Sequence, residues 1–205
     1  MFLHTIHLLR IKDWLKNLVI FFPIIFSSNI YVFNNLKNVF LAFTIFSFAA
    51  SCIYILNDII DYKDDQLHEI KKFKKPLAAK NLSIKFAIYL LAFFLIITAI
   101  LLSYYQEILY FILIYFLINF SYSFFLKKIK YLEMFLICFG YLIRLYLGAH
   151  VIDVQTSILL GMSVFGLSLF VISIKRSVEI LHQNTNRQRK LNYSNKILNL
   201  ITILS

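Results

Sequence analysis

The sequence is poor in the residues that interrupt helices, and it is poor in charge. Its 205 residues include only four glycines and two prolines, and charged residues make up 15%, whereas hydrophobic residues make up 60%. Soluble globular domains average about 25% charged residues, and disordered chains contain far fewer apolar residues than this sequence does. The composition therefore excludes both classes and indicates an integral membrane protein.

Cysteine is also scarce, and its placement gives no sign of a metal site. Cys52 and Cys138 lie in separate apolar stretches without metal-type spacing, so both are interpreted as buried packing residues. The histidines form no ligand pattern either, and this holds for His4, His7, His150 and His182. Neither residue type therefore predicts chemistry.

Apolar stretches account for most of the chain. They are residues 18–33, 39–56, 84–103, 108–126, 132–152 and 158–174. Most approach the ~20 residues that a helical span needs, although the first is short and contains Pro23. Several stretches are apolar on every face, and the alternation typical of barrel strands is absent. The predicted fold is all-α, a multi-span transmembrane helical bundle of about six spans in a single integral membrane domain, 1–205.

A seventh apolar run begins after Lys196 and includes the last nine residues of the sequence. Nine residues are too few to cross a bilayer, which needs about 20. We therefore expect the start of a seventh span and an incomplete C-terminal end.

The basic residues are distributed unevenly among the loops. The formal charge of +11 could indicate nucleic-acid binding, but 19 of the 21 Lys and Arg residues lie on one side of the predicted spans. Only Lys37 lies opposite, and Arg144 lies within a span. The positive-inside rule then predicts a cytoplasmic N-terminus and cytoplasmic basic loops. We expect the membrane to be a bacterial inner membrane. Because the charge excess follows the topology, no nucleic-acid partner is expected.

An acidic cluster follows the second apolar stretch directly, where residues 57–65 read NDIIDYKDD. On a helix, Asp58, Asp61 and Asp65 fall within an arc of roughly 60°, whereas Asp64 points about 120° away toward water. Carboxylates suit Mg²⁺, which usually completes its shell with substrate phosphates. The pattern predicts a catalytic magnesium site and a diphosphate donor, with Asn57 orienting a carboxylate or binding phosphate. The alternative is an acidic loop that only solvates a helix end.

Cations near this cluster are candidates for phosphate binding. Lys71 and Lys75 follow it closely and could neutralise a leaving pyrophosphate, although anionic lipid headgroups could also explain them. Arg144 is interpreted either as a structurally paired arginine or as a contact to a lipid phosphate or the donor.

The spacing Asn57-Asp58-x-x-Asp61-x-x-x-Asp65 resembles the first aspartate motif of the UbiA-type membrane prenyltransferases. It is closest to the decaprenyl-phosphate phosphoribosyltransferase branch, where a His-Pro-x-Lys and Arg-Pro-(Leu/Ile)-Ala pattern follows. That pattern is matched here by His68, Lys71, Pro76 and Ala78, with Glu69 and Lys75 in place of Pro and Arg. Other segments are also similar to the family: Arg10-x-x-x-Trp14-x-Lys16-Asn17, Tyr122-Ser123-x-x-Leu126-Lys127 with Glu133, Gly140-x-x-x-Arg144-x-x-x-Gly148 and Lys175-Arg176-x-x-Glu179.

This resemblance implies a nine-span family fold and adds substrate-binding candidates, namely Lys16, Tyr122, Lys127, Arg144, Lys175 and Arg176. It also implies an activity, the Mg²⁺-dependent transfer of 5-phosphoribose from phosphoribosyl pyrophosphate to a polyprenyl phosphate. A second Asp-x-x-x-Asp is not present around Glu133, and Lys127 stands where this branch has a lysine, which favours a ribose donor. The alternatives are prenyl transfer from a polyprenyl diphosphate, a transporter, and an inactive remnant. Four glycines offer little support for the broken helices of a transporter.

Overall fold

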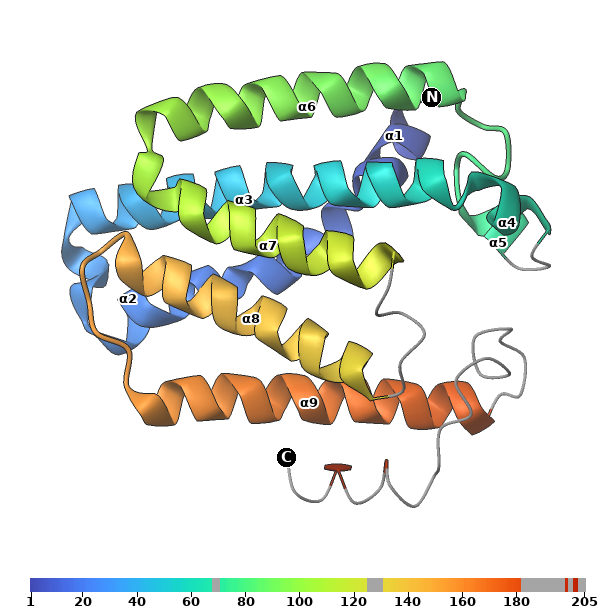
Figure 1. Ribbon diagram of the computed structural model, residues 1–205. Helices are drawn as coiled ribbons and strands as arrows, with labels where there is room; N and C mark the ends of the chain where they lie inside the picture. The colour runs from blue at the N-terminus through green and yellow to red at the C-terminus, as the bar shows by residue number, and fades with distance from the viewer. Residues whose placement is uncertain (68–70, 125–130, 182–197, 199–200, 203–205) are drawn as a thin grey trace.

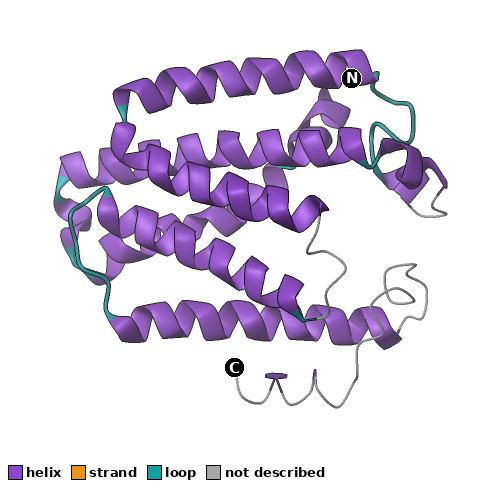
Figure 2. Cartoon of the chain, viewed as in Figure 1, coloured by secondary structure: helices purple, strands orange, loops and turns teal. Residues whose placement is uncertain are grey.

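The structure is a computed structural model that describes residues 1–67, 71–124, 131–181, 198 and 201–202. Within these residues every regular element is helical and no strand occurs (Figures 1 and 2). The long helices are α3 (Phe33–Ile60), α6 (Ile84–Tyr104), α7 (Gln106–Phe124), α8 (Leu132–His150) and α9 (Ile158–Leu181). The prediction of an all-α helical bundle is confirmed.

Five helices in the described part of the chain are long and apolar enough to cross a membrane. They cover residues 33–60, 84–104, 106–123, 132–150 and 158–178. These ranges correspond to the last five predicted stretches, because long apolar runs without proline favour continuous helices.

The first predicted span, residues 18–33, is divided among short helical elements and does not form one long helix. Residues 2–31 form four short elements, namely α1 (Phe2–Leu9), η1 (Ile11–Phe21), α2 (Phe22–Phe26) and η2 (Asn29–Tyr31). Arg10 ends α1 in a left-handed conformation with φ 52°, and Pro23 stands in the first turn of α2. Proline is tolerated at a helix start but not in a helix interior, so the chain changes helix there.

The 3₁₀ helix η1 is long for its kind, and polar contacts to α3 hold it in place. Trp14 Nε1 donates a hydrogen bond to Ser51 Oγ at 3.0 Å, and Asn17 Nδ2 donates one to Ser47 Oγ at 2.9 Å. Runs of 3₁₀ helix beyond a few residues are uncommon because their hydrogen bonds are poorly aligned. Tertiary partners therefore stabilise this segment more than local geometry does.

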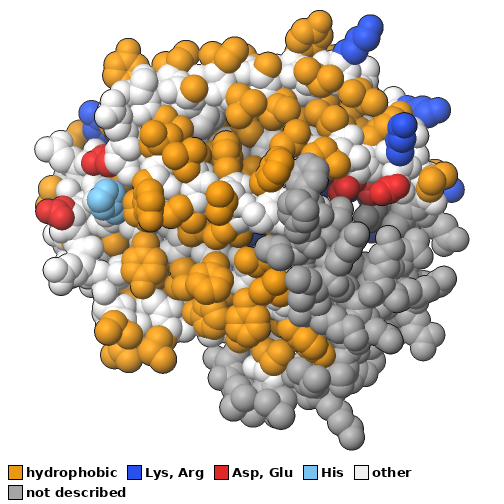
Figure 3. Space-filling model, in the orientation of Figure 1, with side chains coloured by type: hydrophobic (Ala, Val, Ile, Leu, Met, Phe, Trp, Pro, Cys, Tyr) orange, Lys and Arg blue, Asp and Glu red, His pale blue; other side chains and the backbone are white. Residues whose placement is uncertain are grey.

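Helix α3 runs through the middle of the bundle, with α6 on one side and α7 and α8 on the other (Figure 1). Its buried residues Ile45, Phe46 and Ala49 belong to a core shared with η1, α7 and α8. The outer helix α6 instead exposes apolar side chains, as a lipid-facing helix does. Figure 3 shows hydrophobic side chains over most of one face, and most of the visible Lys and Arg lie at the end where α3 meets α4 (Tyr62–Leu67).

Helix α8 approaches η1 closely at Gly148. A Cβ atom at this position would lie 2.0 Å from the backbone oxygen of Ile20, whereas at Gly161 it would meet only the Tyr146 hydroxyl, at 3.3 Å. Only glycine therefore allows these two backbones to pack at their present distance.

We predict that Gly148→Ala destabilises the protein by about 1–3 kcal/mol, because the added methyl group overpacks a backbone contact that cannot rotate away. Thermal unfolding of the purified protein in detergent measures this. Gly161→Ala is the matched control and should stay close to the unmodified protein; equal losses in both variants would contradict the close packing.

Candidate functional site

The carboxylates of the acidic cluster lie where α3 passes into α4. Backbone hydrogen bonds from Asp61 N to Asn57 O and from Asp65 N to Asp61 O, both 2.9 Å, continue the helical path across the junction. Asp58 and Asp65 consequently lie on the same face, two turns apart, and both are buried, at 3% and 2% exposure. Asp61 is half-buried at the junction, and Asp64 is exposed, as the spacing predicts.

Two cations are paired with the buried carboxylates. Lys75, which follows α5 (Lys71–Lys74), places its Nζ 2.8 Å from Asp58 Oδ1 and 2.5 Å from Asp65 Oδ2. The Nη2 of Arg10 lies 2.8 Å from the same Asp58 oxygen. Arg10, which is distant in sequence, therefore meets three residues of the segment 58–75 in one ionic cluster, which we call the Asp58 cluster and define as Arg10, Asp58, Asp65 and Lys75.

Lys75 is charged in this setting. Burial is the largest single influence and lowers the pKa of its ammonium group, but the charges of Asp58 and Asp65, with the hydrogen bonds to both, together outweigh it. The net effect raises the pKa above the ordinary lysine value. A raised folded-state pKa means that this pairing stabilises the fold at neutral pH and is lost only as the pH rises through that raised value.

Arg10 is the residue of this cluster that sequence reasoning did not place in the site. It was part of the segment that resembles the family, but 48 residues separate it from Asp58, so no local spacing links the two. Its guanidinium carbon also lies 4.8 Å from the centre of the Tyr54 ring, one turn before Asp58 on α3. Ring and carboxylate together fix the direction of the arginine side chain.

The carboxylates are suitable ligands for Mg²⁺, but they are not gathered as a complete metal site. The described residues contain no group of three or more His, Cys, Asp or Glu side chains that could hold a metal ion. Lys75 touches both Asp58 and Asp65, which is the position that a shared cation takes. Mg²⁺ is often bound by one or two carboxylates with substrate phosphates and water, so this donor set fits the ion in that manner.

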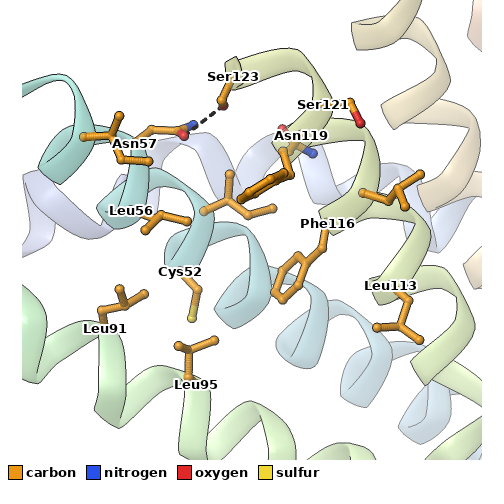
Figure 4. Close-up of a pocket in the computed structure, with 14 residues that line it drawn as sticks. Cys52, Leu56, Asn57, Leu91, Leu95, Leu113, Phe116, Asn119, Ser121 and Ser123 are labelled. Atoms are coloured by element: carbon orange, nitrogen blue, oxygen red, sulfur yellow. Dashed lines mark hydrogen bonds between the residues drawn. The ribbon is translucent and has the colours of Figure 1, made fainter. Parts of the chain in front are cut away.

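Polar groups from α7, α8 and α9 meet close by in the fold. Asn57 accepts a hydrogen bond from Ser123 Oγ at 3.0 Å, which joins the ends of α3 and α7 (Figure 4). Tyr122 donates to Glu133 Oε2 at 3.2 Å, and Arg176 Nη2 pairs with Glu133 Oε1 at 2.7 Å. Glu133 is fully buried, so the charge of Arg176 is paired inside the protein and does not face solvent.

Arg144 is held by protein groups on all sides. Its Nε donates to Asn17 Oδ1 at 2.7 Å, its Nη1 to Gly140 O at 2.6 Å and its Nη2 to the Tyr115 hydroxyl at 3.3 Å. The guanidinium carbon lies 4.7 Å from the centre of the Phe46 ring. These contacts agree with the structurally paired interpretation, and a substrate contact stays a prediction.

The other predicted binding residues are spread more widely. Lys16 pairs with Asp13 at 2.6 Å on the surface, and Lys175 is exposed next to buried Arg176. Lys127 lies outside the described residues, and so does the side chain of Lys71, whose backbone begins α5. The structure thus brings Lys75 to the carboxylates and leaves Lys16 and Lys175 facing outward.

Comparison with known proteins adds independent information. A sequence profile described as the UbiA prenyltransferase family matches residues 18–193. A decaprenyl-phosphate phosphoribosyltransferase from Corynebacterium glutamicum is 32% identical over 185 residues, which cover 86% of this chain and 55% of that protein. One from Mycolicibacterium smegmatis is 30% identical over 208 residues, covering 96% of this chain and 64% of that protein. An uncharacterized protein, y4nM, from Sinorhizobium fredii is 28% identical over 187 residues, covering 88% of this chain and 35% of that protein. The chain spans less than two thirds of the length of these relatives.

We predict that Arg10→Gln lowers the free energy of unfolding by about 1.5 kcal/mol, since it removes a charge-assisted hydrogen bond to a buried carboxylate from a side chain that is itself partly exposed. Denaturation in detergent measures the loss. Lys12→Gln, an exposed position two residues on, is the control; if both variants lose the same amount, the Arg10 pairing contributes nothing specific.

Proposed function

The chain belongs to the UbiA prenyltransferase family, and we propose that it is a membrane-bound transferase acting on a diphosphate donor and a polyprenyl lipid. The observation that carries the proposal is the Asp58 cluster, in which two buried carboxylates are held with two cations at the end of a long apolar helix. A buried set of charges at such a place is costly, so it is uncommon without a function.

The finer proposal is transfer of 5-phosphoribose from phosphoribosyl pyrophosphate to a polyprenyl phosphate, with release of pyrophosphate. It is supported by the two relatives named decaprenyl-phosphate phosphoribosyltransferase and by the sequence pattern around Asp58, Asp61 and Asp65. Prenyl transfer from a polyprenyl diphosphate is the second candidate, because the family profile carries that name and the donor also ends in a diphosphate.

Mg²⁺ would be held by Asp58 and Asp65, with Asp61 as the third candidate ligand, and when bound it supplies positive charge against the departing diphosphate. Arg10 and Lys75 already lie against these carboxylates and can donate hydrogen bonds to phosphate oxygens of the donor. Asn57, at the same helix end, can orient the donor through its amide.

The acceptor needs no general base in this reaction. A polyprenyl phosphate already carries a negative oxygen at neutral pH, so its attack on the ribose carbon requires no proton removal. The task of the protein is then to hold the two phosphate-bearing substrates close together and to offset their charge.

We expect Asp58→Asn, Asp61→Asn and Asp65→Asn each to reduce Mg²⁺-dependent pyrophosphate release by on the order of 100-fold or more, because each removes a ligand charge without changing size. Release is followed with purified protein in lipid nanodiscs. Asp64→Asn is the matched control and should be mild, since Asp64 is exposed. Full activity of the Asp61→Asn variant would contradict the assignment of Asp61 as a metal ligand.

The donor can be identified through its second phosphate. Phosphoribosyl pyrophosphate carries a separate 5-phosphate, for which the sequence offers Lys127, Lys175 and Arg176, although Arg176 already pairs with buried Glu133. Losing one charge-assisted contact should raise the donor KM about 10- to 150-fold. We therefore predict that Lys127→Met raises the donor KM within this range and changes the KM for the lipid little. Lys37→Met, at the opposite end of α3, is the control and should leave both KM values unchanged. Transfer only from a polyprenyl diphosphate would favour the second candidate.

The proposed orientation places the Asp58 cluster at the cytoplasmic face of a bacterial inner membrane, following the distribution of basic residues. Single cysteines introduced as Gln66→Cys and Lys128→Cys should then react only with thiol reagents that reach the cytoplasm. Lys37→Cys should react only from the other side. Labelling of Gln66→Cys from outside intact cells would reverse the orientation.

A further inference from the structure

Arg10 occupies a strained position between two weak helical segments. Its φ of 52° is left-handed, a conformation that favours glycine, and its backbone both ends α1 and begins η1. Helix α1 has only eight residues, and η1 is a 3₁₀ helix, whose hydrogen bonds are poorly aligned. Neither segment alone can fix the point from which the arginine side chain reaches Asp58. That point depends on contacts from elsewhere in the fold.

One hydroxyl group of α3 contacts the chain on both sides of Arg10. Ser51 Oγ donates a hydrogen bond to Leu9 O at 2.9 Å and accepts one from Trp14 Nε1 at 3.0 Å. The Leu9 carbonyl lies in the last turn of α1, where carbonyl groups lack partners within the helix. Ser51 is fully buried, so solvent does not compete for its hydroxyl. The same side chain therefore holds the end of α1 and the first half of η1.

Ser51 belongs to a line of residues on one face of α3 that contacts the N-terminal segment. The line follows intervals of four, three and four residues, which keep side chains on one helix face, and consists of Ser47, Ser51, Tyr54 and Asp58. At one end, Ser47 accepts a hydrogen bond from Asn17 at 2.9 Å. At the other end, Asp58 pairs with Arg10 at 2.8 Å. The N-terminal segment therefore runs antiparallel along this face, and Ser51 lies two turns from Asp58.

We propose that Ser51 is a positioning residue for the Asp58 cluster, which fixes the backbone of Arg10 so that its guanidinium group reaches Asp58 and the donor diphosphate. The inference rests on the proposed function and adds the residue that places one of the cations of the site. Tyr54 and Asp58 give the arginine side chain its direction, whereas Ser51 sets where that side chain begins. Ser51 acts through Arg10 and needs no contact with the donor.

Removal of the hydroxyl takes a partner from the Leu9 carbonyl and from the Trp14 indole. A buried polar group without a partner is costly, so the chain around Arg10 shifts until these groups find other partners. Asp58 stays in place meanwhile, because it belongs to the continuous helix α3. One ordinary hydrogen bond corresponds to a factor of roughly 2 to 12 in an equilibrium constant. The equilibrium between paired and released Arg10 should change by a factor in this range.

The position of Arg10 can be measured without any reaction of the enzyme. Phenylglyoxal modifies guanidinium groups that are accessible and unpaired, and mass spectrometry of the full chain in lipid nanodiscs gives the rate at Arg10. Ser51→Ala should raise this rate about fivefold.

Ser47→Ala is the matched control for this measurement. It removes an equally buried hydroxyl one turn away on the same face of α3, and Asn17 keeps its hydrogen bond from Arg144. The rate at Arg10 should therefore stay unchanged. Equal rates in the Ser51→Ala and Ser47→Ala variants would overturn the proposal.

Trp14→Phe provides a second variant if Ser51→Ala does not fold. It removes only the indole N–H, keeps an aromatic ring next to Phe48 and leaves the hydrogen bond from Ser51 to Leu9. The modification rate at Arg10 should rise about twofold, because one of the two hydrogen bonds is lost. In that case an unchanged rate would overturn the proposal.

The effect on the site is tested by a double-mutant cycle, with inorganic pyrophosphate and Mn²⁺ as the probes. Ser51→Ala should weaken pyrophosphate binding about fivefold in the presence of Arg10. In an Arg10→Gln background it should have no further effect, because Ser51 acts through the arginine. An equal loss in both backgrounds would mean that Ser51 supports the fold in general, and this result would overturn the proposal.

The two measurements separate the failure of this inference from that of the proposed function. A raised modification rate with unchanged pyrophosphate binding would support the positioning of Arg10 and contradict the Asp58 cluster as the diphosphate site. An unchanged modification rate would contradict the positioning by Ser51, whatever the affinity for pyrophosphate.

Discussion

The ionic contacts of the Asp58 cluster join parts of the chain that also share the apolar core around Leu8, Ile55 and Leu77. Arg10 follows the N-terminal helix, Asp58 ends α3, Asp65 lies in α4 and Lys75 leads toward α6. Removing one partner from a buried set of charges leaves another uncompensated, which costs several kcal/mol. The two carboxylates therefore help to position the N-terminal segment, the junction between α3 and α4, and the segment that leads to α6.

The charges of this cluster also limit what it can bind. Two carboxylates and two cations balance one another, so within these four residues a bare diphosphate would add negative charge without a spare cation. A divalent cation alone would add positive charge beside Arg10 and Lys75. When the divalent cation and the diphosphate bind together, their charges largely offset each other, and this is the usual mode for Mg²⁺ with substrate phosphates.

Sequence alone predicts those features that follow from local periodicity. The five long spans arise from uninterrupted apolar runs, and the outward position of Asp64 follows from the helical repeat. The 3₁₀ segment could not be predicted, because Trp14 and Asn17 are stabilised by serines of α3 about 30 residues away or more. The pairing of Arg10 with Asp58, over 48 residues, depends in the same way on tertiary packing. Periodicity identifies the carboxylates, then, and long-range packing decides which cations meet them.

The most direct measurement of the central claim is Mn²⁺ binding, followed by electron paramagnetic resonance as a substitute for Mg²⁺, with and without inorganic pyrophosphate. The account predicts that pyrophosphate strengthens Mn²⁺ binding to the unmodified protein at least about tenfold, a coupling of ~1.4 kcal/mol, and that a double variant with Asp58→Asn and Asp65→Asn loses it. Binding that ignores pyrophosphate, or that survives in the double variant, would contradict a site in which these two carboxylates and a diphosphate hold the metal together.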